Sequence, residues 1–538
     1  MKSYDAIVVG AGHNGLTNAA FLARAGLDVV CVEKNDYIGG ATVSRNLYKD
    51  WWYSNCSYVC SLLRPEIFRE LELQKHGLQI TPFGGSVTYM ENGDFYGSYN
   101  DSEVKYREMA RFSRHDADAY KSYSADTMRQ CRLIRDFLLT TAPDPTSFKP
   151  SDLKELARLG GKFMEMGEDR MYETIRFWTM SVAEYLDEYF ETDVIKASLS
   201  GSGIIGTALG IQSPGTAYVL LHHYMGDVDG NVGSWGFARG GMGAVAKAIA
   251  GAFQAAGGEL RTEAGVEKII VKNGKAAGVA LDNGDEIFAP VVVSSMDVKR
   301  TFLNCVDKSE LPEKFYNRVK HFKARGSSGK LNIALDGLPT FPALPEGSSL
   351  YGADMHFTDS MERMERAYDD WKDGTWSKDP YVDMVIPTLS DPTMAPEGKH
   401  YMSCFVQYCP YQIDGRAWTS EEKDAFGQTV IDQIADYSPD FKDLILHVEI
   451  RTPQDIESEI GITEGNIFHG ELTMDQLLMN RPVPGYAQYR SPIGGLYMCG
   501  SSTHPGGGVM AAPGANAARE ILSDLRRPNT VPESFGDD

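Results

Sequence analysis

The amino-terminal region shows three consecutive hydrophobic patterns. Residues 6–9 form a short apolar run, glycines follow it, and apolar residues then recur at helical spacing from about residue 16 to residue 25. A second apolar run covers residues 28–32. This order of strand, glycine turn, helix and strand predicts the first βαβ unit of a dinucleotide-binding fold.

Later stretches extend the prediction to a mixed α/β protein. Residues 266–296 alternate apolar and polar positions around two Asn-Gly turns, which predicts a β-meander. Residues 152–190 repeat apolar positions every three or four residues, so we expect helices in the middle of the chain. Residues 496–499 form another apolar strand before a glycine-rich loop and a helix that begins near Pro513. The polar tail, residues 526–538, is predicted to be disordered.

The glycines of the first turn follow the G-x-G-x-x-G spacing. Gly10 permits the tight turn, Gly12 leaves room for a pyrophosphate, and Gly15 lets the helix pack closely on the sheet. Glu33, about twenty residues past the turn, is placed to accept hydrogen bonds from ribose hydroxyls and argues against a 2′-phosphate. The predicted dinucleotide contacts in this unit are Gly10, Ala11, Gly12, Asn14, Gly15, Glu33 and Lys34.

Two further glycine segments favour FAD over NAD. Gly39, Gly40 and Ala41 follow Glu33, where backbone lying against a longer, bent ligand suits FAD, although an ordinary surface turn is the alternative. At the other end of the chain, a helix behind a glycine-rich loop would point its positive end at an anionic group, such as the edge of a reduced isoalloxazine. Two glycine turns nearly five hundred residues apart fit one long dinucleotide held at both ends. The predicted contacts in the second turn are Gly500, Gly508, Val509 and Met510.

The sequence offers one further candidate for a pyridine nucleotide site. Gly240, Gly241 and Gly243 precede an amphipathic helix, but residues 235–239 match an apolar strand poorly. We therefore interpret this segment as a packing turn. The electron acceptor is then expected to be oxygen, a quinone or a redox partner.

Composition and charge exclude several classes of partner. The 538 residues carry a formal charge of -22 with a pI near 5.0, so nucleic acid is not expected as a partner. Anionic membrane surfaces are disfavoured, although a local apolar patch leaves peripheral lipid contact open. We expect no transmembrane segment and no signal peptide. The eight cysteines are scattered without a C-x-x-C pair, which favours a reducing, cytoplasmic location.

Six stretches along the whole chain carry a family resemblance. They are VVGAGHNGL, VEKNDYIGGA, CSYVCSLLRPEI, GSWGFARGGMGA, GNIFHGELTMDQL and LYMCGSSTHPGGGVMAAPGANAA. With them the chain resembles the phytoene desaturase and flavin amine oxidase superfamily of flavoproteins, most closely the subgroup named pyridine nucleotide-disulphide oxidoreductase domain-containing protein two. Two features depart from the pattern: no arginine follows the glycine pair directly, and there is no dithiol.

The resemblance implies a discontinuous α/β layout. A Rossmann-like FAD-binding domain of the glutathione-reductase type would consist of residues 1–75, 230–310 and 470–538. An inserted α+β substrate domain would consist of residues 76–229 and 311–469. By family analogy Val266 lies at the adenine and Ser295 near the diphosphate.

Flavin dehydrogenation needs groups near the flavin that handle a proton. His504 lies in the carboxy-terminal glycine loop, where it could relay a proton or only orient the loop. Lys330 begins an apolar strand, and flavin oxidases of the wider family place a lysine at N5 through a water; a solvated strand-end lysine is the alternative. His469 lies in a family motif and could instead pack between domains. The His222-His223 pair is interpreted as core or surface, and no ligand spacing predicts a metal.

These features predict an FAD-dependent oxidoreductase that dehydrogenates an apolar or aromatic small molecule. Hydride would pass to the flavin, which is held noncovalently. A flavin amine oxidase, a non-redox flavin-dependent isomerase and a flavin-loaded interaction protein remain alternatives. The residues do not identify the substrate.

Overall fold

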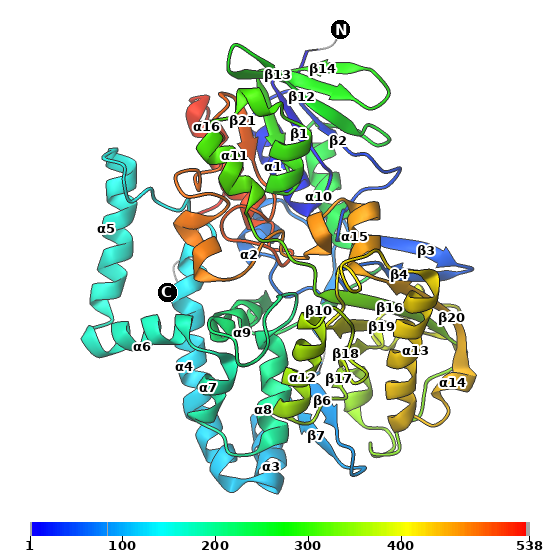
Figure 1. Ribbon diagram of the computed structural model, residues 1–538. Helices are drawn as coiled ribbons and strands as arrows, with labels where there is room; N and C mark the ends of the chain where they lie inside the picture. The colour runs from blue at the N-terminus through cyan, green and yellow to red at the C-terminus, as the bar shows by residue number, and fades with distance from the viewer. Residues whose placement is uncertain (1–2, 83, 534–538) are drawn as a thin grey trace.

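The computed structural model describes residues 3–82 and 84–533, and its first layer is a five-stranded parallel sheet (Figure 1). In spatial order the strands are β11 (Glu259–Arg261), β2 (Val29–Val32), β1 (Ala6–Val9), β15 (Val291–Ser294) and β21 (Leu496–Met498). The sheet thus joins strands from the two ends of the chain. β1, β2, β15 and β21 are fully buried, as apolar strands covered on both faces are.

Different elements cover the two faces of this sheet. Ala6 and Val8 of β1 pack in one hydrophobic cluster with helices, while Ile7 and Val9 pack in another with the meander. The helices are α1 (His13–Arg24), α10 (Gly243–Ala255) and α16 (Ala512–Asp524). The other face carries β12 (Val266–Lys272), β13 (Lys275–Leu281), β14 (Glu286–Phe288) and α11 (Glu313–Lys320).

The second layer is a seven-stranded mixed sheet. Its order is β20 (Ile445–Arg451), β16 (Ser328–Leu335), β19 (His400–Gln407), β18 (Tyr381–Val385), β17 (Asp354–His356), β6 (Ser86–Tyr89) and β7 (Phe95–Ser98). Only β17 and β6 pair in parallel among these strands. Phe426, Val430 and Ile434 of α13 (Ser420–Tyr437) pack in the same core as residues of this sheet.

Helices from the middle of the chain complete the molecule. They are α3 (Ser102–Phe112), α4 (Arg114–Leu138), α5 (Pro150–Glu165), α6 (Glu168–Thr179), α7 (Val182–Asp187), α8 (Asp193–Ser200), α9 (Thr216–Tyr224) and α12 (Met361–Lys372). α5 projects from the body on the left of Figure 1. No helix in the described ranges is long and apolar enough to cross a bilayer.

The remaining strands and α-helices in the described ranges are short. They are β3 (Ser44–Tyr48), β4 (Trp51–Ser54), α2 (Pro65–Glu70), β5 (Ile80–Pro82), β8 (Asp227–Val228), β9 (Asn231–Val232), β10 (Gly236–Ala238), α14 (Phe441–Leu444) and α15 (Pro453–Ile460). β10 corrects one expectation, because a short strand does precede the Gly240-Gly241 turn. It pairs antiparallel with β5 rather than entering the parallel sheet.

The carboxy-terminal tail corrects a second expectation. The hydroxyl of Thr530 donates to the carbonyl of Phe21 in α1 at 2.8 Å, and Val531 is buried. Residues 530–532 therefore contact the body of the protein, whereas residues 526–529 are exposed. Residues 534–538, also predicted to be disordered, lie outside the described residues.

Candidate active site

A cavity of about 350 Å³ opens at the end of β1 and β2, and we call it the nucleotide cavity. Gly10, Glu33, Lys34 and Val266, all predicted dinucleotide contacts, line it together. Glu33 Oε2 accepts the N–H of Ala11 at 2.9 Å, which ties the acid to the glycine turn. Burial raises the pKa of Glu33, because the carboxylate is removed from water in the wall of the cavity.

The backbone around the turn is packed too closely for side chains. A Cβ on Gly15 would lie 2.1 Å from the carbonyl oxygen of Gly10. Gly39 donates its N–H to the Ala11 carbonyl at 2.9 Å, so the second glycine segment lies directly against the first. Ser295 lies at the same turn, with its Cβ 3.6 Å from the position of a Cβ on Gly10.

Two buried helix N-termini converge on this region. Neither α1 nor α16 has a side-chain cap or a first-turn acid in the described part of the chain. The two helices also touch, because Asn18 Nδ2 donates to the carbonyl of Gly514 at 3.0 Å. Buried N–H groups without caps need an acceptor, and an anionic ligand supplies one.

The helix after the Gly240-Gly241 turn behaves differently. The hydroxyl oxygens of Ser44 and Ser54 accept the N–H groups of Gly243 and Met242 at 2.9 and 3.1 Å. The N-terminus of α10 is thus satisfied by the protein itself, which agrees with its interpretation as a packing turn.

The remaining predicted contacts connect the turns to a second cavity. Asn14 Nδ2 donates to the Ser501 hydroxyl at 3.1 Å, one residue beyond Gly500. Met510 accepts the N–H of Arg64 through its carbonyl at 3.2 Å. Ala41, Gly508 and Val509 line the second cavity. The residues present fit an extended dinucleotide: a cavity with an acid at one end, two uncapped helix N-termini, and glycines that admit close approach.

The second cavity, here called the inner cavity, measures about 130 Å³ and surrounds the end of β16. Lys330 lines it and is 2% exposed, which excludes the solvated strand-end alternative. Its Nζ donates to the Cys56 carbonyl at 2.9 Å and lies 5.0 Å from the ring centroid of Tyr58. Burial lowers the pKa of Lys330 to about 7. Apolar and aromatic side chains form most of the remaining wall, among them Leu62, Ile205, Trp235, Phe405, Ile467 and Phe468.

Three histidines face the same cavity. His469 was predicted, whereas His13 and His223 were not assigned to the site. His469 Nδ1 and His13 Nε2 are buried without a hydrogen-bond partner among the described residues. Burial lowers the pKa of His469 to about 4 and that of His13 to about 3, so both rings are neutral at pH 7. His13 stands at an unspecified position of the G-x-G-x-x-G motif, so the motif did not predict a histidine at the site.

His504 requires a correction. Its Nε2 bonds to the carbonyl of Phe137 in α4 at 2.8 Å, and the residue lines neither the nucleotide cavity nor the inner cavity. The ring is therefore turned toward α4, because that buried carbonyl needs a donor. This geometry fits the loop-orienting alternative rather than proton relay. His222 and His223 are both buried, as expected of core histidines.

Arg481 is a further residue without a sequence signal. Its side chain is fully buried, and its guanidinium donates to the carbonyls of Phe468, Glu471, Gln476 and Ser501. It thereby joins the loop that carries His469 to the loop after β21. The sequences of the two loops do not predict a buried arginine, because arginine side chains are most often exposed.

A third cavity, the polar chamber, measures about 500 Å³. It shares Ile205 and Trp235 with the inner cavity and is rich in hydroxyl side chains. Asp354, His356 and Asp383 lie in its wall, each with a ligand atom within 4.8 Å of the others. This cluster was not singled out by the sequence, because it forms only when β17 and β18 pair.

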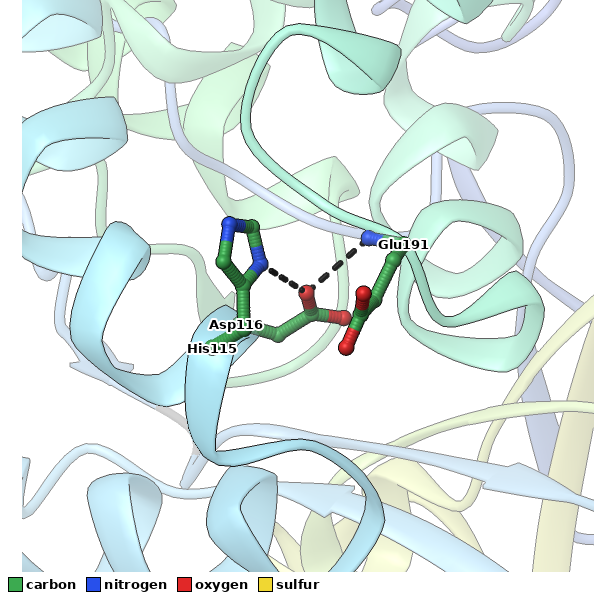
Figure 2. Close-up of side chains that lie close together, drawn as sticks. All are labelled: His115, Asp116 and Glu191. Atoms are coloured by element: carbon green, nitrogen blue, oxygen red, sulfur yellow. Dashed lines mark hydrogen bonds and ion pairs between the residues drawn. The ribbon is translucent and has the colours of Figure 1, made fainter.

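A second acid and histidine cluster is structural. Figure 2 shows Asp116 accepting the N–H of Glu191 at 2.9 Å and bonding to the His115 ring at 3.1 Å. Its other oxygen accepts the N–H of Thr192 at 2.9 Å, while Glu191 accepts the hydroxyl of Ser113 at 2.7 Å. These bonds join α4 to the chain before α8 and satisfy the Asp116 carboxylate.

Comparisons with known proteins indicate the family of the chain. The family described as FAD dependent oxidoreductase matches residues 5–193. The chain is 37% identical to pyridine nucleotide-disulfide oxidoreductase domain-containing protein 2 of Mus musculus, over 97% of this chain and 94% of that protein. It is 26% identical to one of the subunits of limonene dehydrogenase from Castellaniella defragrans, over 98% of this chain and 95% of that protein.

Solved structures share the fold. Cyclohexylamine oxidase from Brevibacterium oxydans superposes with a TM-score of 0.59 at 16% identity, covering 98% of this chain and 100% of that one. The family match indicates the class, the FAD-dependent oxidoreductases, with FAD as the cofactor. The chain belongs to the family of pyridine nucleotide-disulfide oxidoreductase domain-containing protein 2. The predicted family and cofactor are thus confirmed.

Proposed function

We propose that this protein uses FAD to remove a hydride from a small molecule whose apolar part occupies the inner cavity. The observation that carries the proposal is Lys330, a buried amine in an otherwise mostly apolar cavity between the two glycine turns. A lysine with a pKa near 7 is poised to exchange protons at physiological pH.

The chain's own groups would hold the substrate and move its proton. When bound, FAD supplies the two-electron acceptor for the hydride. The neutral Lys330 amine would take the proton released at the reacting centre. His469 Nδ1, a second acceptor facing the cavity, is the alternative proton site. Leu62, Ile467 and Phe468 would exclude water from the reaction.

As part of this proposal, the chain divides into two discontinuous domains. An FAD-binding domain of glutathione-reductase type would contain residues 1–75, 230–310 and 470–538. The inserted substrate domain would contain residues 76–229 and 311–469. Support comes from the strands, since all five of the parallel sheet lie in the first set and all seven of the mixed sheet lie in the second.

The apolar wall and the similarity to a limonene dehydrogenase support a hydrophobic, carbon-centred substrate. Flavin amine oxidase is the second candidate function. The observation that favours it is the carboxyl pair of half-buried Asp354 and buried Asp383 in the chamber next to the inner cavity.

Anaerobic flavin bleaching tests the proposal. Purified protein is mixed with a panel of cyclic alkenes and cyclic amines, and flavin absorbance is followed before oxygen, a quinone or a protein acceptor is added. We expect bleaching by a panel member and recovery with an acceptor. Turnover of substrate without bleaching would instead support a non-redox isomerase. A flavin that no member of either chemical class reduces would contradict the proposal.

A further inference from the structure

The polar chamber contains a pair of carboxyl groups without a counter-ion. Asp354 on β17 and Asp383 on β18 lie side by side, and Asp383 is 1% exposed. One oxygen of each, Oδ1, is buried without a hydrogen-bond donor in the described ranges. Buried acceptors without donors are uncommon in native structures and indicate a missing partner.

The second carboxyl oxygens of the cluster are already engaged, whereas His356 Nδ1 is buried without a partner in the described ranges. The hydroxyl of Tyr58 donates to Asp383 Oδ2 at 2.7 Å, and His356 Nε2 bonds to Asp354 Oδ2 at 3.0 Å. Burial, and then the charge of Asp354, raises the pKa of Asp383, while burial raises the pKa of Asp354 to about 6. The pair therefore retains a proton near neutral pH unless a cation joins it.

The chamber wall does not supply that cation. Lys105 is the one lysine or arginine in the described lining, and its ammonium donates to the Tyr120 hydroxyl at 3.1 Å. Burial lowers the pKa of His356, which leaves its ring neutral. Without a ligand the two carboxyl groups share the retained proton in a side-chain hydrogen bond, so a cation that replaces this proton would have to come from a ligand that enters the chamber.

We propose that the chamber binds a protonated amine of the substrate between Asp354 and Asp383, while the reacting carbon lies in the inner cavity beside Lys330. The inference rests on the proposed function. Tyr58 connects the two places, because its side chain lines the inner cavity and its hydroxyl binds Asp383. The amine is a recognition group at a distance from the flavin, and no bond to it breaks.

An ammonium fits the cluster better than a divalent metal. Its N–H donors would use the two free Oδ1 atoms and leave the bonds to Tyr58 and His356 intact. A metal would need more ligands than these two oxygens, and His356 Nδ1 is the one other unpartnered atom of the three side chains in the described cluster. The rings of Trp235 and Tyr381 in the same wall also favour an organic cation.

The test uses the flavin-loaded full chain with n-hexylamine, n-hexanol and manganese chloride as probes at about pH 8. Binding is followed by perturbation of the flavin spectrum and by thermal shift. We expect hexylamine to bind about tenfold or more tightly than hexanol. Asp383→Asn and Asp354→Asn should each reduce this preference about tenfold or more, since an amide leaves the ammonium unpaired.

Asp424→Asn, an exposed acid on α13, is the matched control and should leave the preference unchanged. Equal binding of hexylamine and hexanol by the folded wild-type protein overturns the inference. So does saturable manganese binding that Asp383→Asn abolishes. Flavin content in the same preparations separates the two claims, because a protein without flavin contradicts the proposed function, whereas a flavin protein indifferent to the ligand's charge contradicts only this inference.

Discussion

At the scale of single residues, the site depends on ionisable groups held away from water. Lys330 is surrounded by the carbonyl of Cys56, the ring of Tyr58, and Glu449 and Arg451 on β20. Desolvation outweighs the neighbouring acid, and the lysine pKa falls to about 7. Neutral amine is then abundant at physiological pH, which an exposed lysine would not provide.

The rate of anaerobic flavin reduction should rise with pH through about 7, because Lys330 accepts a proton only as the neutral amine. Lys330→Met should lower this rate by about a hundredfold and remove the pH-dependent rise. Stopped-flow absorbance across this range measures both. Lys330→Arg, which stays protonated, should be equally slow; a variant with wild-type rate and profile would refute the role.

The same lysine should affect stability. Its pKa is about 7 when folded and 10.5 in its ordinary state, so the unfolded chain binds more protons between these values. The free energy of unfolding should therefore rise with pH across this window. Chemical denaturation at about pH 7 and pH 10 should show this rise reduced in Lys330→Met. An unchanged rise would assign it to other groups.

At the scale of elements, loops and helix ends converge on the proposed flavin site. Arg481 joins the His469 loop to the loop after β21 through backbone carbonyls. α16 packs against α1 so closely that a Cβ on Gly514 would lie 2.2 Å from the Asn14 carbonyl oxygen. The contact between the two helices places the second glycine turn beside the first.

Arg481→Lys should destabilise the protein by about 3 kcal/mol or more, because one ammonium cannot pair with four carbonyls and leaves buried acceptors unsatisfied. It should also weaken FAD binding, measured by flavin release during dialysis. Arg366→Lys, on the exposed face of α12, is the control and should change stability by less than about 0.5 kcal/mol. Equal effects of the two substitutions would contradict the positioning role.

Gly514→Ala should lower both flavin content and melting temperature, since its methyl group forces α16 away from α1. Gly160→Ala is the matched control: it lies in α5 with nothing within 4 Å of the added Cβ, and should be neutral or stabilise by about 0.5–1 kcal/mol. Retention of full flavin by Gly514→Ala would contradict the proposed contact between helix ends.

The sequence predicted the elements that have local signals. The strand and glycine turn at residues 6–15, the meander and the carboxy-terminal helix follow from apolar spacing and glycine positions. It did not reveal the chamber acids, because Asp354 and Asp383 meet only across paired strands. Likewise, the position of His504 in its loop did not predict the hydrogen bond of its ring to a carbonyl on α4, because that contact joins residues far apart in the sequence.

At the scale of the whole molecule, the two ends of the chain form one sheet and one ligand site. β1 and β21 lie on either side of β15 and run parallel to it. Each glycine turn follows the carboxyl end of its strand, so both turns lie at the same end of the sheet. The mixed sheet brings Lys330 and the chamber acids to the other side of the site. Under the proposed function, the parallel sheet would hold the cofactor and the mixed sheet would recognise the substrate.

The electron density of crystals of the purified, flavin-loaded protein tests the central claim most directly. We predict continuous density for one FAD, with its adenosine in the cavity beside Glu33 and its isoalloxazine at the inner cavity beside Lys330. Density for a nicotinamide dinucleotide in these cavities, or a flavin whose ring lies away from Lys330, would contradict the account.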